Sequence, residues 1–427
     1  MHSWSAPAIP TLPGKGSIVN LHDTAAAALA PTRGVGDRAN LYVCGITPYD
    51  ATHLGHASTY LAYDLLVRAW RDAGRRVTYV QNVTDVDDPL LERATESGVS
   101  WRQLAEDQTD LFRSDMAALR VLPPDSYVGV VEAVDVVVAA VEHMLEEGTA
   151  YRVSIPDGAG GRAPELGDVY ADLSIDPLFG TGARLEQDEM MRVFAENGGD
   201  PERPGKRQAL DPLLWRRTRP GEPEWDGGVL GTGRPGWHIE CACLAHAYLG
   251  AHVEVQGGGR DLVFPHHEMS ESHLRMLGGD TMPVMLHSHA GLVGYDGEKM
   301  SKSRGNLVLV SRLVAGGAEP MAVRLVVLGH HYRSDWEYRD EDLAAAEVRL
   351  DRWRRACETG SGPDAEPVLA EVRAALADDL DAPRAVAAVD AWVERALDGA
   401  GDQVDGAPDL VRRTVDALLG VSLLRPS

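Results

Sequence analysis

A short apolar run, a polar loop, a helical pattern and a second apolar run follow one another between residues 41 and 83. The first run covers residues 41–44 and is followed by Gly45. The helical pattern places apolar side chains three, four and three positions apart, at Tyr60, Tyr63, Val67 and Trp70. Gly74 ends the helix, and residues 77–83 are largely apolar, as expected of a strand covered on both faces. The segment predicts a β-α-β unit of an α/β fold.

The loops after these two strands are the expected position of a ligand site. In open parallel sheets, ligands bind beyond the carboxyl ends of the strands. Residues 44–56 and 82–88 should therefore line one site.

The composition and the hydrophobic pattern change twice along the rest of the chain. Residues 123–234 begin with a helical pattern and continue with stretches rich in Gly, Pro and charge, which indicates an insertion that splits the α/β domain. Strand and helix patterning resumes after it, and amphipathic helices follow from about residue 316. We expect five segments: an N-terminal extension at 1–37, the two halves of the α/β domain at 38–122 and 235–315, the insertion at 123–234, and a helical C-terminal domain at 316–427.

The charge and cysteine content restrict the class of protein. A formal charge of −24 argues against broad, nonspecific polyanion binding, although a local basic patch stays possible. Four cysteines are too few for a disulfide scaffold, so reduced thiols in the cytoplasm are expected, and metal binding stays open. We see no export signal, and the longest apolar run is far shorter than the roughly 20 residues that span a bilayer. We expect a soluble protein without a membrane partner.

The sequence His53-Leu54-Gly55-His56 lies where the first strand gives way to the first helix. Free backbone N–H groups and the helix dipole at such a position favour phosphate. Gly55 permits close approach of the backbone, and the two imidazoles can donate hydrogen bonds to phosphoryl oxygens.

Lysine is rare, yet two of the four lysines lie within one pentapeptide, Lys299-Met300-Ser301-Lys302-Ser303. A solvated charged loop is one explanation. The other is a mobile loop whose two ammonium groups stabilise charge on a phosphoryl transition state. Together with His53 and His56, Lys299 and Lys302 predict nucleotidyl transfer from ATP.

This combination resembles the HIGH and KMSKS signatures of class I aminoacyl-tRNA synthetases. The resemblance covers roughly residues 40–340 and implies a Rossmann-like catalytic domain with an insertion. It is greatest to cysteinyl enzymes, through Tyr42-Val43-Cys44-Gly45, YVQNVTDVDD at 79–88, RPGWHIEC at 234–241 and GGGRDLVFPHHE at 257–268.

The resemblance implies one zinc ion per chain, held by Cys44, Cys241 and His266, that recognises the thiol of L-cysteine. Three protein ligands leave a tetrahedral position that a substrate thiolate fills better than a serine hydroxyl. Without the resemblance, two buried cysteines and a core histidine would be the simpler explanation. Cys243 and His267 are rival ligands.

One departure points to a second branch of the family. Cysteinyl-tRNA synthetases carry a fourth ligand, Glu, where this chain has Ser270, and that change resembles the ligases of mycothiol synthesis, which join cysteine to glucosaminyl-inositol. The sequence Cys44-Gly45-Ile46-Thr47-Pro48 and the ENGGDP stretch at 196–201 resemble that branch too, although Asn197 replaces the Arg of its ERGGDP signature. From Glu337 onward there are 20 acidic and 11 basic residues, a poor surface for tRNA phosphates.

The resemblance also implies an adenylate pocket. Its expected contacts to cysteinyl-AMP are Cys44, Gly45, Ile46, Thr47, Thr59, Asn82, Val83, Thr84, Trp237, Gly259, Arg260, Asp261 and Val293. Mg²⁺ should accompany ATP. Asp85, Asp87 and Asp88 allow a magnesium cluster, but Asp88 before Pro89 favours a helix N-cap.

We therefore expect a monomeric, ATP-dependent ligase whose substrates are L-cysteine, ATP and glucosaminyl-inositol, with no tRNA partner. A cysteinyl-tRNA synthetase with a shortened tail and a non-catalytic cysteine- or zinc-sensing paralogue are the alternatives.

Overall fold

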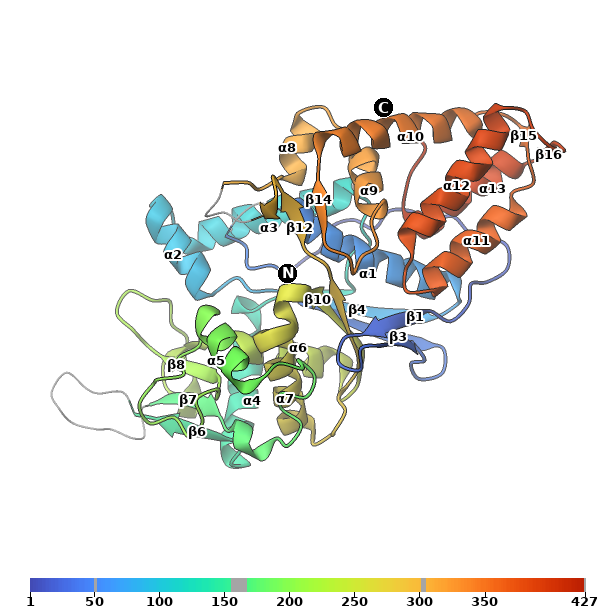
Figure 1. The fold of residues 1–427 in the computed structure, drawn as a ribbon. Helices are drawn as coiled ribbons and strands as arrows, with labels where there is room; N and C mark the ends of the chain where they lie inside the picture. Colours follow the sequence, from blue (N-terminus) through green and yellow to red (C-terminus); the bar gives the residue numbers. More distant parts are fainter. Residues whose placement is uncertain (50–51, 155–166, 301–304, 426–427) are drawn as a thin grey trace.

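The computed structural model describes residues 1–49, 52–154, 167–300 and 305–425 (Figure 1). Its centre is a five-stranded sheet in the order β11-β10-β3-β4-β5, and every neighbouring pair is parallel. The predicted α/β fold is confirmed. The strands are β3 (Arg38–Val43), β4 (Arg76–Val83), β5 (Ser126–Gly129), β10 (Val253–Gly259) and β11 (Val284–Ala290).

Helices cover both faces of this sheet. Leu41 and Val43 point to one face and belong to the core cluster of α1 (Leu54–Asp72). Tyr42 points to the other face, in the cluster of α6 (Trp237–Leu249) and α7 (Glu268–Gly278). Because β4 and β10 lie on opposite sides of β3, the chain leaves β3 at a switch point, where a crevice opens at the carboxyl ends.

The helix after β4 begins one residue earlier than the sequence pattern indicated. In α2 (Asp88–Ser97) the N-cap is Asp87, whose side chain accepts a hydrogen bond from the Asp88 backbone N–H. The prediction of Asp88 as the cap is wrong, because the Asp88 carboxylate is engaged by Arg216 and Arg234 instead. Helix α3 (Trp101–Ala118) then leads to β5.

A second sheet interrupts the first between β5 and β10. It is antiparallel, with the order β6-β7-β8-β9, and is drawn in green in Figure 1. Its core is shared with α4 and α6 through residues such as Val141, Trp215 and Ile239. The elements of this part are α4 (Val134–Glu146), β6 (Ala150–Val153), β7 (Asp168–Ala171), α5 (Gln187–Glu196), β8 (Leu213–Arg217) and β9 (Gly233–Pro235).

The C-terminal part packs against α1. The amphipathic helices expected from about residue 316 are present. Apolar side chains such as Val389 of α12 (Ala382–Leu397) and Val415 of α13 (Ala407–Leu419) are buried, whereas Leu397 is 39% exposed. The elements are β12 (Val293–Tyr295), β13 (Glu298–Lys299), β14 (Trp336–Tyr338), β15 (Ser361–Gly362), β16 (Val404–Asp405), α8 (Val310–Ala315), α9 (Pro320–Leu328), α10 (Asp340–Ala356), α11 (Glu366–Ala377), α12 (Ala382–Leu397) and α13 (Ala407–Leu419). Near the N-terminus, β1 (Asn20–Asp23) pairs with β2 (Ala28–Pro31).

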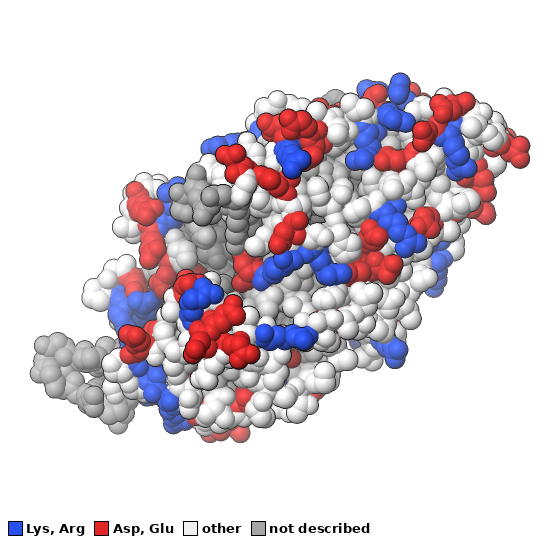
Figure 2. Space-filling view, viewed as in Figure 1, with Lys and Arg blue, Asp and Glu red and all other residues white. Residues whose placement is uncertain are grey.

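Charge is mixed over the surface drawn in Figure 2. Acidic and basic side chains lie among one another on this face, and no broad basic area is visible there. Among the described residues, no helix combines the length and the apolar character that a bilayer crossing requires.

Candidate active site

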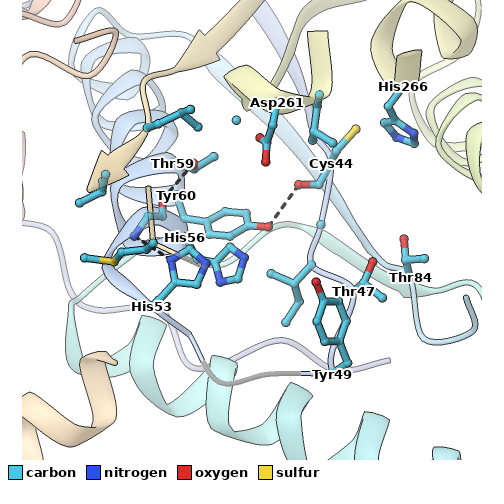
Figure 3. Close-up of a pocket in the computed structure, with 18 of the residues that line it drawn as sticks. Cys44, Thr47, Tyr49, His53, His56, Thr59, Tyr60, Thr84, Asp261 and His266 are labelled. Carbon is cyan, nitrogen blue, oxygen red and sulfur yellow. Dashed lines mark hydrogen bonds between the residues drawn. The ribbon is translucent and has the colours of Figure 1, made fainter. Parts of the chain in front are cut away.

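A cavity of about 410 Å³ opens at the carboxyl ends of β3, β4 and β10. Most of the predicted adenylate residues lie on its wall. These are Cys44, Gly45, Ile46, Thr47, Thr59, Thr84, Trp237, Gly259, Asp261 and Val293. Figure 3 shows Cys44 and His266 on one side of it, with His53 and His56 on the opposite side.

Three of the predicted adenylate residues lie off this wall. Val83 is fully buried in the main core. Arg260 is directed to Asp335, 2.8 Å away. Asn82 is buried behind the wall and is 1% exposed. A direct contact of these three with cysteinyl-AMP stays a prediction.

Asn82 shapes the wall from behind. Its Oδ1 accepts a hydrogen bond of 2.8 Å from the Gly45 backbone N–H, and its Nδ2 donates to Thr84 Oγ1 over 3.2 Å. A Cβ on Gly45 would lie 1.6 Å from the Asn82 backbone oxygen, so only glycine fits there. Asn82 therefore ties the loop after β3 to the loop after β4.

Cys44, Cys241 and His266 form the group at one end of the cavity. Their ligand atoms all lie within 4.8 Å of one another, and all three side chains are buried. Cys44 Sγ lies 3.6 Å from Cys241 Sγ, and His266 Nε2 lies 3.1 Å from Cys241 Sγ. The three residues come from three elements that converge at the switch point: the end of β3, helix α6, and the turn Val263–His267 after β10. This is a possible metal site.

The Cys44 and Cys241 thiols are hydrogen-bonded to each other and lie among buried apolar side chains. A hydrogen bond from Cys44, together with the nearby His266, holds the pKa of Cys241 well below its ordinary value. Burial raises the pKa of Cys44. One sulfur of the pair is therefore favoured as a thiolate, the form that binds metal.

The rival ligands occupy different positions. Cys243 packs in the separate core of α4 and the second sheet, away from the cavity. His267 Nε2 lies 3.2 Å from Cys44 Sγ, but its Nδ1 is 2.7 Å from His289 Nε2, and His267 is not part of the three-residue group. Ser270 is buried on α7, and its Oγ has no hydrogen-bond partner among the described residues.

His238 contacts His266 of this possible metal site, a contact that the sequence pattern did not indicate. Its Nδ1 lies 3.1 Å from His266 Nδ1, on the side of the ring opposite to Cys241. Burial lowers the pKa of His238 well below its ordinary value. Partners of this kind orient metal-binding histidines. The only sequence signal was its position three residues before Cys241 on the same helix.

The opposite end of the cavity is the N-terminus of α1. His53 is the N-cap, and its Nδ1 accepts a hydrogen bond of 3.0 Å from Gly55 N. The His53 and His56 rings stack with their centroids 3.9 Å apart. Burial lowers the pKa of His56 to about 4, so its imidazole is neutral near pH 7. His56 Nδ1 has no partner among the described residues, which leaves it for a ligand.

The segments around the lysine motif lie beside this helix terminus. Leu54 N donates to Val308 O over 2.9 Å, and Val310 N donates to Thr52 O over 3.0 Å. Met300 is buried on the cavity wall, and its N–H donates to Val293 O. Lys299 ends β13, whereas Lys302 lies outside the described residues.

Tyr60 is a further residue that sequence reasoning assigned only to the helix core. Its hydroxyl donates to the Cys44 backbone oxygen over 3.2 Å, as the dashed line in Figure 3 shows. A helix pattern cannot distinguish a tyrosine that packs from one that holds a site loop.

Comparison with known proteins agrees with this geometry. A family model described as tRNA synthetases class I (C) catalytic domain matches residues 32–348. The fold is similar to that of a methionyl-tRNA synthetase from Mycobacterium tuberculosis bound by methionyl-adenylate, with a TM-score of 0.61 and 16% identity over 90% of this chain and 92% of that one.

Full-length relatives are much more similar in sequence. A Sanguibacter keddieii protein named L-cysteine:1D-myo-inositol 2-amino-2-deoxy-alpha-D-glucopyranoside ligase is 62% identical over 99% of this chain and 100% of its own length. A Streptomyces coelicolor protein of the same name is 54% identical over the same shares of both chains. The chain thus belongs to the class I tRNA synthetase (C) catalytic-domain family and, within it, to the group formed by these ligases.

Proposed function

We propose that the chain is an ATP-dependent ligase that activates L-cysteine as cysteinyl-adenylate and transfers the cysteinyl group to the amine of glucosaminyl-inositol. The observation that carries this function is one continuous cavity with Cys44, Cys241 and His266 at one end and the N-terminus of α1 at the other. The names of the full-length relatives supply the two organic substrates.

The three-residue group fits Zn²⁺. Two sulfurs and one imidazole nitrogen are a zinc donor set, and a fourth position stays open to a ligand. Bound there, Zn²⁺ would act as a Lewis acid with a strong preference for the thiolate of cysteine over the hydroxyl of serine. Such a difference in affinity makes a separate editing site unnecessary.

The protein then has to place the cysteine carboxylate in line with the α-phosphorus of ATP. The carboxylate oxygen forms a bond to phosphorus while the bond to pyrophosphate breaks, and pyrophosphate leaves with the electron pair. The imidazoles of His53 and His56 at the start of α1 bind the phosphate oxygens in this proposal, because the Leu54 and Gly55 N–H groups already donate within the protein. Lys299 and Lys302 are proposed to neutralise the leaving pyrophosphate.

The nucleoside lies on the β10 side of the cavity in this proposal. Asp261 and Gly259 are on the wall there, and a carboxylate can accept hydrogen bonds from both ribose hydroxyls. Among the described residues, the one group of three possible metal ligands is the cysteine site. Mg²⁺ is therefore proposed to enter with ATP, bound mainly to its phosphate oxygens.

The second step is an aminolysis. The neutral sugar amine attacks the carbonyl carbon of cysteinyl-AMP, a C–N bond forms, and the bond from carbon to the phosphate oxygen breaks. AMP leaves with that electron pair, and the nitrogen loses one proton to give the amide.

Two measurements test this function. Cysteine-dependent exchange between ATP and labelled pyrophosphate reports the first step, and serine should support none. Addition of glucosaminyl-inositol to the preformed adenylate should then release AMP rapidly, whereas tRNA should not. Fast charging of tRNA would show a cysteinyl-tRNA synthetase, and absence of exchange in folded, zinc-loaded protein would show a non-catalytic paralogue.

A further inference from the structure

A second, larger cavity of about 690 Å³ adjoins the first. The two cavities share Thr47, Tyr49, Asn197 and Trp237 as wall residues, so they are adjacent. The second lies between the N-terminus of α2 and the inserted sheet, with α5 on its edge. Apart from the shared residues and His238, its lining has no part in the adenylation proposed above.

The lining of this cavity carries charges of both signs. Six carboxylates and four guanidinium groups belong to it, from Asp87, Asp88, Glu92, Asp168, Glu196, Asp200, Arg203, Arg216, Arg219 and Arg234. The rings of Tyr170 and Phe194 are also on the wall. Sugar and inositol hydroxyl groups both donate and accept hydrogen bonds, so a lining of carboxylates and guanidinium groups beside aromatic rings fits a polyol.

Several of these charged groups are fixed in place before any ligand binds. Asp168 is buried, and its Oδ2 accepts hydrogen bonds from Arg203 over 2.6 Å and from Arg219 over 2.8 Å. Arg216 lies between Asp88, 3.2 Å away, and Glu222, 3.0 Å away. Donors held in this way lose little conformational entropy on binding.

Two of the lining carboxylates are left to act on the charge of a ligand. Asp88, Asp168, Glu196 and Asp200 each pair with an arginine or lysine. Asp87 and Glu92 form no salt bridge among the described residues, and such carboxylates attract an ammonium group. A volume of about 690 Å³ falls within the range of roughly 300 to 1,000 Å³ that is usual for small-molecule sites. The occupant favoured by both properties is an amino-polyol rather than tRNA.

Asp87 is a wall carboxylate of the second cavity that follows a segment lining the first. It follows the same strand as Thr84, which lines the first cavity, and it lies on the wall of the second. Its Oδ1 caps α2 through Asp88 N over 2.8 Å. Burial raises its pKa to about 6, so it is charged near pH 7 and still able to take a proton from an ammonium group.

We propose that the second cavity binds the glucosaminyl-inositol acceptor, with its amine beside the shared wall residues Asn197 and Trp237 and hydrogen-bonded to Asp87. This assignment rests on the proposed function. It also places Asn197, which departs from the ERGGDP signature, where adenylate and acceptor meet.

Two matched variants on one exposed helix face test the assignment. Glu92 and Glu96 are both exposed residues of α2, one turn apart, but only Glu92 lines the cavity. In the full-length zinc-loaded protein, Glu92→Trp should raise KM for glucosaminyl-inositol at least about tenfold, because the ring fills acceptor space. Glu96→Trp should leave it unchanged, and cysteine-dependent pyrophosphate exchange should be normal in both.

Two further variants keep the test decisive if the tryptophan perturbs folding. Arg219→Gln leaves Asp168 paired with Arg203 and should raise the acceptor KM about tenfold. Asp87→Asn keeps a good N-cap, so α2 should stay folded. Because the variant lacks the carboxylate that accepts the proton, kcat for amide formation should fall about tenfold or more.

The outcomes separate the two proposals. Normal exchange together with unchanged acceptor kinetics in Glu92→Trp, Arg219→Gln and Asp87→Asn would overturn the cavity assignment alone. Absence of exchange or of amide product in the wild-type protein would overturn the proposed function itself.

Discussion

The sulfur of Cys44 lies 3.6 Å from the sulfur of Cys241, although 197 positions separate the two residues in the chain. They meet because β3 ends where helix α6 packs on the same face of the central sheet. Each is buried, and neither belongs to a disulfide. With His266 beside it, the pair forms the proposed zinc site.

Replacement of Cys241 by serine should abolish the proposed zinc binding. A serine hydroxyl is a far weaker zinc ligand than a thiolate, so metal content should fall from one equivalent to near zero. The apparent KM for cysteine in pyrophosphate exchange should rise at least about a hundredfold. Metal analysis of the purified protein measures the first effect. The control is Cys243→Ala on the same helix, because Cys243 packs in a separate core and should keep full metal content.

Replacement of His238 by alanine should weaken zinc binding without abolishing it. Loss of the ring beside His266 Nδ1 removes the group that orients this ligand, and such changes cost about 10- to 100-fold in metal affinity. Added zinc should restore exchange in the variant. His246→Ala, two turns further along α6, is the matched control. Equal zinc affinity in both variants would show that His238 does not support the site.

Replacement of Gly45 by alanine should disrupt adenylation. The new Cβ would overlap the Asn82 backbone oxygen, so the loop after β3 would have to move away from Thr84 and the cavity wall. We expect a loss of roughly 1 to 3 kcal/mol in unfolding free energy and an exchange rate reduced more than tenfold. Gly360→Ala is the control, since nothing lies within 4 Å of its added Cβ. An active Gly45→Ala enzyme would contradict the described approach of the two loops.

Asp64 links α1 to the C-terminal helices through two buried arginines. Its carboxylate pairs with Arg68, 2.8 Å away, and with Arg324 of α9, and all three side chains are fully buried. Arg68 and Arg324 in turn donate to backbone oxygens of α13. Asp64→Ala should therefore lower the unfolding free energy by about 3 to 5 kcal/mol, because two buried cations lose their partner. Glu371→Ala, at an exposed pair with Arg384, should cost less than about 1 kcal/mol.

The buried group of Asp64, Arg68 and Arg324 also predicts how the stability of the protein depends on pH. Burial alone would raise the pKa of Asp64, but Arg68 and Arg324 hold it below its ordinary value. A carboxyl with a lowered folded-state pKa stabilises the protein above the unfolded pKa of about 4, and this contribution disappears as the pH falls through the folded value. Denaturant unfolding of the wild type should therefore lose stability below about pH 4, and Asp64→Asn should show a flatter curve there.

The central fold could be predicted because its signals are local. The apolar runs that became β3 and β4 and the spaced apolar residues of α1 each reflect burial on the sheet. The two ends of the cavity also follow from a general rule, that parallel sheets bind ligands at their carboxyl ends.

Other features depend on contacts that no local pattern contains. Asp87 rather than Asp88 became the helix cap because distant arginines of β8 and β9 engage Asp88. The resemblance predicts an adenylate contact for Asn82, but no sequence pattern indicated that its side chain also holds Gly45 and Thr84. The second cavity lies between α2 and the inserted sheet. Sequence patterns do not show that elements so far apart in the chain are neighbours in the fold.

The most direct test of the central claim follows the cysteinyl group itself. The enzyme is loaded with ³⁵S-cysteine and ATP, freed of excess substrates, and mixed with unlabelled cysteine together with glucosaminyl-inositol and tRNA. We predict that the bound label passes within a single turnover into the amide with glucosaminyl-inositol, with one AMP released per amide and no further ATP required. Label recovered on tRNA, or released as free cysteine while the amide stays unlabelled, would contradict the account.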